Sequence, residues 1–159
     1  MYGTRNTLSE AIRQKSVELL NRHLAAAIDL HAQVKQAHWN VRGANFIAIH
    51  ELFDKVADAA EGYSDTIAER AAQLGGTAEG TVQTAAERSF LSPYNLGVAD
   101  EKQHIAAVAD VLAAFGQSVR NAIDASDGFG DKDTADLFTE VSRGVDYQLW
   151  LVEAHLMRG

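Results

Sequence analysis

Apolar side chains recur every three or four positions along four long stretches of this chain, the spacing that gathers side chains on one face of an α-helix. The first stretch runs from about Leu8 to Val41. One face of it carries Leu20, Leu24, Ala27, His31, Val34 and His38. The pattern predicts a second helix capped by Asn45 and running to Leu74. Two more helices are predicted, from about Asp100 to Ala125 and from about Asp133 to Met157.

Capping and turn residues mark the ends of these helices. Thr7 and Glu10 have the spacing of a capping box, in which the two side chains satisfy free N–H groups at the start of a helix. Residues 42–44, Arg-Gly-Ala, interrupt the first pattern, and Gly75-Gly76 ends the second. Residues 126–130, Ser-Asp-Gly-Phe-Gly, are predicted to be the loop between the last two helices.

The connection in the middle of the chain is long for a compact bundle. It spans Thr77 to Ala99, with room for a short helix from Val82 to Arg88 before the Ser92-Pro93 break. Such a length indicates a crossover rather than a hairpin. We therefore predict an all-α fold, a ferritin-like four-helix bundle over residues 8–159 preceded by a short tail, residues 1–7.

Composition narrows the class of protein. The 159 residues suit one domain, and they include a single proline and no cysteine, which excludes disulfides, zinc–thiolate sites and thiol catalysis. No apolar run approaches the ~20 residues of a membrane span, and the N-terminus lacks the apolar core of a secretory signal. We expect a cytoplasmic protein with no membrane contact.

The second helix carries two stripes of side chains. A narrow apolar stripe is expected to face the core: Ile49, Phe53, Val56, Ala60, Tyr63, Ile67 and Ala71. Beside it lies a polar stripe: His50, Asp54, Asp58, Glu61, Asp65 and Glu69. The ordinary explanation of a polar stripe is a solvated face. However, this one contains no lysine or arginine to offset its repelling acids, and His50 stands four residues before Asp54, a spacing that suits one metal ion.

Distance along the helix separates the stripe into two halves. Asp54 and Asp65 are eleven residues apart, so about 16 Å lies between them along the axis. One ion therefore cannot bind both to His50 and Asp54 and to Asp65 and Glu69 of the same helix. Two antiparallel copies related by a two-fold axis would bring the halves together and form two equivalent sites. His38 could add a nitrogen ligand, and the mixture of imidazole and carboxylate suits iron, zinc or manganese.

Four stretches of sequence resemble the Dps family, the mini-ferritins of starved bacterial cells. They are KQAHWNVRGANFIAIHELFD at 35–54, DTIAERAAQLGG at 65–76, DKDTADLF at 131–138 and LWLVEAHL at 149–156. The resemblance covers about residues 8–157. It implies a hollow homododecamer with ferroxidase sites between two-fold related subunits.

The resemblance also implies a ligand set and an activity. His38, His50 and Asp54 would come from one subunit, and Asp65 and Glu69 from its partner. The expected reaction is oxidation of Fe(II), preferably by hydrogen peroxide. Ferric oxyhydroxide would then be stored in the cavity, so that DNA is protected from oxidative damage.

Two further roles follow from the resemblance. Trp39, directly after a ligand, could intercept a stray oxidising equivalent, and interface packing is the alternative. Acids gather around the start of the last helix: Asp127, Asp131, Asp133, Asp136 and Glu140. The helix dipole accounts for one or two of them. Around a three-fold axis they would form a ring that attracts cations, and the resemblance favours Asp136, and after it Asp131, as pore residues.

An alternative metal site would lie within one subunit, as in dimeric bundles of larger ferritins or rubrerythrins. Glu101 and His104 form an E-x-x-H pair, but such sites need two copies and the chain has one. We assign this pair to the capping turn of the third helix.

The alternative function is that of a DNA-binding nucleoid protein. The segment before Thr7 contains one basic residue, Arg5, and the formal charge of −8 becomes about −96 over twelve copies. Arg13 and Lys15 could still form local patches, and divalent ions could bridge to DNA. We expect DNA binding to be weak or absent.

Overall fold

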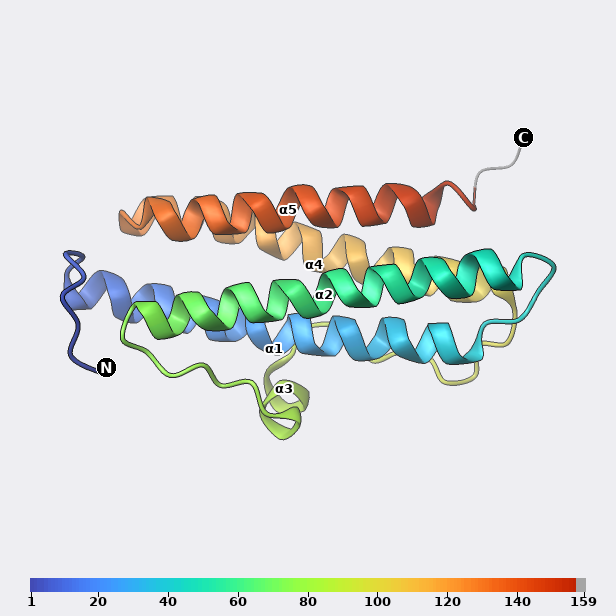
Figure 1. The fold of residues 1–159 in the computed structure, drawn as a ribbon, viewed down its shortest axis with the longest axis horizontal. Helices are drawn as coiled ribbons and strands as arrows, with labels where there is room; N and C mark the ends of the chain where they lie inside the picture. Colours follow the sequence, from blue (N-terminus) through green and yellow to red (C-terminus); the bar gives the residue numbers. More distant parts are fainter. Residues whose placement is uncertain (157–159) are drawn as a thin grey trace.

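The computed structural model describes residues 1–156, and within this part the fold consists of helices alone (Figure 1). The helices are α1 (Glu10–Asn40), α2 (Phe46–Gln73), α3 (Val82–Arg88), α4 (Glu101–Phe129) and α5 (Lys132–Glu153). The four long helices lie side by side as two antiparallel pairs, α1 with α2 and α4 with α5. The connection through α3 crosses the length of the bundle, so the predicted crossover architecture is confirmed.

The core lies between the four long helices. Its largest fully buried side chains include Phe53 of α2, Phe115 of α4 and Phe138 of α5. The apolar stripe predicted on α2 is buried throughout, apart from the half-buried Tyr63. Since the neighbouring polar stripe cannot enter this core, α2 presents it at the surface of the bundle.

The start of α1 differs from the prediction. Ser9, not Thr7, is the N-cap: its backbone is non-helical, and its hydroxyl accepts a hydrogen bond from the Ile12 N–H at 3.3 Å. Arg13 is held close by, with its guanidinium donating to the carbonyl oxygens of Leu8 and Leu74. The predicted Thr7–Glu10 capping box is therefore wrong, because the chain enters the helix two residues later.

The end of α4 also differs. The helix continues through Ser126, whose buried hydroxyl donates to the Ala122 carbonyl at 2.6 Å, and it ends at Phe129. Gly130 then takes the left-handed conformation, with φ 87°, that glycine adopts at helix ends. The predicted five-residue loop is thus wrong, because only the second of its two glycines interrupts the helix.

The bounds of α5 are set by a buried cap. Asp131 accepts from the Thr134 N–H and opens the helix, which runs to Glu153 and is followed by a turn to Leu156. The predicted end at Met157 lies outside the described residues. None of the described helices combines the length and apolar character needed to cross a membrane.

Candidate metal centre

His38 and His50 face each other at the junction of α1 and α2. Their rings are stacked with centroids 3.7 Å apart. Nδ1 of His38 donates to the carbonyl of His50 at 2.8 Å, and Nδ1 of His50 donates to the carbonyl of His38 at 2.9 Å. These bonds fix the tautomer and direct the lone pair to Nε2, which is how proteins prepare histidine for a metal ion.

Asp54 lies next to this histidine pair. Its Oδ1 is 3.8 Å from Nε2 of His38 and accepts a hydrogen bond from Nζ of Lys35 at 2.6 Å. The Lys35 ammonium holds the pKa of the Asp54 carboxyl below its usual value. The stripe itself contains no base, as the sequence indicated, but α1 supplies one, so the inference that its acids lack a partner is wrong for Asp54. A metal ion at Asp54 has to compete with Lys35.

Asp65 and Glu69 lie towards the other end of α2. Both are exposed, and Asp65 with Glu61 and Ser64 lines an open pocket of about 450 Å³ beside the loop that follows α2. Because α2 is one unbroken helix, the separation of about 16 Å along the axis between Asp54 and Asp65 persists.

A single chain does not complete the predicted site. Within residues 1–156, no three histidine or acidic side chains of one chain lie close enough together to hold a metal ion. His38, His50 and Asp54 gather at one end of α2, while Asp65 and Glu69 stay apart from them. The predicted ligands therefore form two incomplete halves.

Large apolar side chains surround the histidine half at the surface. Trp39 is 67% exposed and Ile47 61% exposed, and the ring of Phe46 lies 5.1 Å from that of His50. Solvent-exposed apolar groups of this size, gathered in one place, mark surfaces that another molecule covers. Trp39 also has Lys35 Nζ 5.8 Å from its ring centroid. Its part in oxidation stays a prediction.

Glu101 and His104 are used by the fold. The Glu101 carboxylate accepts from the backbone N–H and from Nδ2 of Asn45, both at 2.9 Å, so α4 anchors the turn that joins α1 to α2. His104 bonds through Nδ1 to the Tyr94 hydroxyl at 2.6 Å. Glu101 lies in the first turn of α4, as predicted, but its carboxylate binds Asn45, and Asp100 is the cap of α4.

Sequence periodicity did not reveal that Glu101 supports the candidate centre. This acid reaches the α1–α2 turn from a helix 56 residues away in the chain. The one local signal is Gly43, where a Cβ atom would collide with the Glu101 side chain. A glycine between two histidine-bearing helices thus marks a close approach as well as a turn.

The two predicted pore residues have different environments. Asp131 is 1% exposed; it pairs with Arg70 at 2.9 Å and accepts from the hydroxyl of Thr134 at 2.6 Å. Burial alone would raise the pKa of Asp131, but its hydrogen bonds and Arg70 outweigh burial and lower it. Asp136 is exposed, as are Asp133 and the other acids near it. Because the Asp131 carboxylate is already bound inside the bundle, it is not available to line a pore, whereas the exposed Asp136 is.

Known proteins resemble this chain along nearly its full length. Residues 17–159 match the family described as ferritin-like domain. The DNA protection during starvation protein of Agrobacterium fabrum is 41% identical over 155 residues, which cover 98% of this chain and 96% of that protein. Its counterpart in Brevibacillus brevis is 30% identical, covering 94% of this chain and 99% of that one.

Solved structures agree with these relatives. A tetragonal form of Mycobacterium smegmatis Dps superimposes with a TM-score of 0.94 at 30% identity, covering 100% of this chain and 96% of that one. Dps from Microbacterium arborescens, in its high iron form, gives a TM-score of 0.86 at 36% identity. The match covers 96% of this chain and 97% of that one.

Proposed function

This chain belongs to the Dps family of ferritin-like proteins, and we propose that it oxidises Fe(II) at sites shared between two subunits and stores the product inside a shell of twelve. Membership of the family supports iron binding, iron storage and DNA protection in general. The observation that carries the finer proposal is the division of the ligands into two incomplete halves at opposite ends of α2.

A two-fold axis across α2 would complete both halves at once. With two copies antiparallel, Asp65 and Glu69 of each chain approach His50 and Asp54 of the other, and the symmetry makes every such contact twice. The exposed apolar side chains beside the histidines, Trp39 and Ile47 among them, supply surface that a second copy would bury.

The side chains suit Fe(II) as a substrate. The Nδ1 hydrogen bonds of His38 and His50 leave each Nε2 lone pair directed away from the backbone. Carboxylates are hard ligands and favour Fe(III) over Fe(II), which promotes loss of an electron. When iron binds at Asp54, the Lys35 ammonium gives up its hydrogen bond to that carboxylate. Lys35 can then offset the negative charge around the site.

Hydrogen peroxide fits this chemistry as the electron acceptor. One peroxide takes one electron from each of two Fe(II) ions and, with two protons, yields two water molecules and two Fe(III) ions. When both electrons reach the same peroxide, its O–O bond is cleaved to water and no hydroxyl radical is released.

The proposed oxidant preference can be measured directly. Stopped-flow mixing of metal-free protein with Fe(II) should show oxidation at least about tenfold faster with peroxide than with dissolved oxygen. A spin trap should meanwhile detect less hydroxyl radical than in protein-free controls. Equal rates with both oxidants would refute the preference, and a rate no faster than that of free Fe(II) would refute the ferroxidase proposal itself.

The acids near the start of α5 provide a test of iron entry. We propose that Asp136 lines a cation path on a three-fold axis of the shell. Asp136→Asn should slow iron uptake several-fold because a ring loses three charges. It should leave the free energy of unfolding unchanged. Asp131→Asn is the matched comparison: it leaves Arg70 without its buried partner, so it should lower the free energy of unfolding by about 2 kcal/mol.

Urea unfolding and stopped-flow uptake measure the two effects separately. Loss of stability in Asp136→Asn, or unchanged uptake despite an intact fold, would remove Asp136 from the entry path.

DNA binding is the second candidate function, because relatives of this chain are named for DNA protection during starvation. The predicted Arg13 patch is wrong, since this guanidinium is buried and bonded to backbone carbonyls. With a formal charge of −8 per chain, binding should be weak. A gel shift should show DNA released at ~150 mM salt. Retention at that salt would support a nucleoid role instead.

A further inference from the structure

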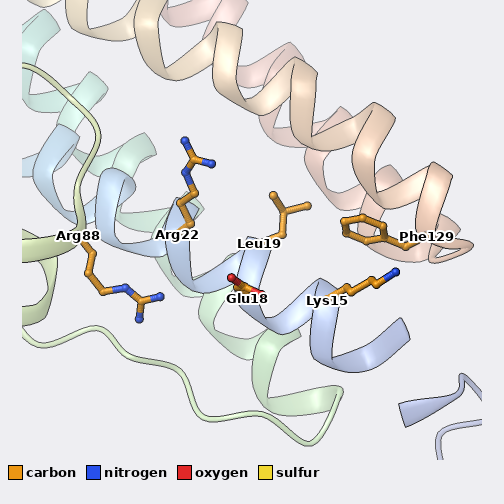
Figure 2. A pocket seen from close by; sticks show the side chains of 6 residues that line it. All are labelled: Lys15, Glu18, Leu19, Arg22, Arg88 and Phe129. Atoms are coloured by element: carbon orange, nitrogen blue, oxygen red, sulfur yellow. The ribbon is translucent and has the colours of Figure 1, made fainter. Parts of the chain in front are cut away.

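A pocket of about 410 Å³ lies on the opposite side of α1 from α2 and is unrelated to the predicted metal ligands. Figure 2 shows its side chains: α1 contributes Lys15, Glu18, Leu19 and Arg22, the crossover helix α3 contributes Arg88, and the end of α4 contributes Phe129. Its volume falls in the range of small-molecule sites.

Basic side chains occupy both ends of the pocket. Arg22 and Arg88 lie at one end and Lys15 at the other (Figure 2). Lys15 and Arg22 are seven residues apart on α1, so they share a face and stand about 10 Å apart along the axis. Arg88 pairs with Glu79, but within residues 1–156 neither Lys15 nor Arg22 forms an ion pair. On an acidic protein, two cations in one pocket that have no acidic partner in this part of the chain favour an anionic ligand.

The arginine end is suited to a phosphate group. Guanidinium groups offer paired N–H donors that match the oxygens of phosphate. Arg22 is held in place by the ring of Phe90, with Cζ 5.4 Å from the ring centroid. Arg22 and Arg88 come from different elements, and their guanidinium groups turn to opposite sides, so Arg22, which has no acidic partner among the described residues, is the group free for a phosphate.

The other end offers a flat apolar surface. The half-buried ring of Phe129 lies there, with Lys15 Nζ 5.8 Å from its centroid. Leu19 forms the apolar wall between the two ends. A planar ring of a ligand could stack on Phe129, as bases stack on aromatic side chains.

The middle of the pocket contains one acid, Glu18. A carboxylate there repels a phosphate placed at the centre, but it accepts hydrogen bonds from hydroxyl groups. Acidic side chains bind the ribose hydroxyls of nucleotides in this way in dinucleotide-binding folds. From the arginine end to Phe129, the pocket thus suits a ligand whose phosphate, hydroxyl groups and ring follow one another in that order.

We propose that this pocket binds a ribonucleoside monophosphate or a similar ring-bearing sugar phosphate. The phosphate lies against Arg22, the sugar hydroxyls face Glu18, and the ring stacks on Phe129. The site is separate from iron oxidation, so either proposal can fail without the other.

Isothermal titration of the assembled protein with adenosine monophosphate tests the proposal. Binding should saturate with a Kd of about 1 mM or lower. Adenosine, inorganic phosphate and the 2′-deoxy nucleotide should each bind at least about fivefold more weakly. Adenosine lacks the phosphate, inorganic phosphate lacks both sugar and ring, and the deoxy nucleotide lacks the 2′-hydroxyl. No saturation below about 10 mM, or equal binding of inorganic phosphate, would overturn the assignment.

Variants locate the site. Arg22→Gln should weaken binding of adenosine monophosphate about tenfold, and Phe129→Leu several-fold. Glu18→Gln should reduce the preference for the ribose over the deoxyribose form. Arg143→Gln, at an exposed arginine of α5, is the matched control and should bind as the parent does. All variants should retain helical circular dichroism and iron oxidation. Binding unchanged in Arg22→Gln would overturn the proposal.

Duplex DNA separates this site from a nucleic-acid surface. A short duplex should not displace a fluorescent adenosine monophosphate analogue at ~150 mM salt, because base-paired bases cannot stack on Phe129 and deoxyribose lacks one hydroxyl for Glu18. Full displacement by the duplex, lost in Arg22→Gln, would assign the pocket to DNA phosphates and overturn the nucleotide proposal.

Discussion

Replacing His50 and Asp54 together by alanine should slow Fe(II) oxidation about a hundredfold or more and leave the shell assembled. The two residues provide a nitrogen and an oxygen at the histidine end of α2, next to His38. Both are only partly buried, so their removal leaves the apolar core intact. Stopped-flow absorbance measures the oxidation, and light scattering measures the particle mass.

Two other acids of α2 provide the matched control. Glu51 and Asp58 are exposed, and neither is among the predicted ligands. The Glu51→Ala/Asp58→Ala double variant removes two negative charges from the same helix, so a general electrostatic effect would slow it equally. We expect it to oxidise iron within about twofold of the parent. Parent-like kinetics in the His50/Asp54 variant would remove these residues from the site.

Mixing two inactive variants should restore about a quarter of the parental activity. One variant is His50→Ala/Asp54→Ala, and the other is Asp65→Ala/Glu69→Ala. A shell made of either variant alone contains no complete site. In a mixed two-fold pair, the intact histidine half of one chain meets the intact acidic half of the other, while the second site loses both halves. Random pairing makes half of the pairs mixed, each with one working site of two.

The experiment needs proof that the chains mix. The two variants are co-expressed with different tags and purified through both, and mass spectrometry gives the ratio of the chains. Unmixed particles would lower the recovered activity below this value, and double-tag purification removes them. Verified mixed particles that are no more active than the two separate variants would exclude sites shared between subunits.

Much of this architecture follows from local patterns. The spacing of apolar residues predicted the four long helices, and α3 has the predicted bounds, Val82–Arg88. The stripe on α2 was predictable because a helix places every third or fourth residue on one face. The separation of its two halves was equally predictable, since the rise per residue is constant. These properties depend on neighbours in the sequence, and the structure preserves them.

Helix ends were less predictable. Ser9 rather than Thr7 caps α1, and α4 continues through Gly128 to Phe129. Both errors arise where several residues of suitable type stand close together. Capping preferences alone do not choose among such residues, because the packing of the rest of the helix decides where the chain turns.

Local patterns in the chain were enough to predict the helices, the division of the predicted ligands and the family. Which charges meet became visible in the packed bundle, where Lys35 pairs with Asp54, Arg70 pairs with Asp131, and Glu101 holds the turn at Asn45. The reason is physical. A helix fixes the positions of its own side chains through its backbone hydrogen bonds. Contacts between helices depend instead on how all four pack together, and no local pattern encodes that arrangement.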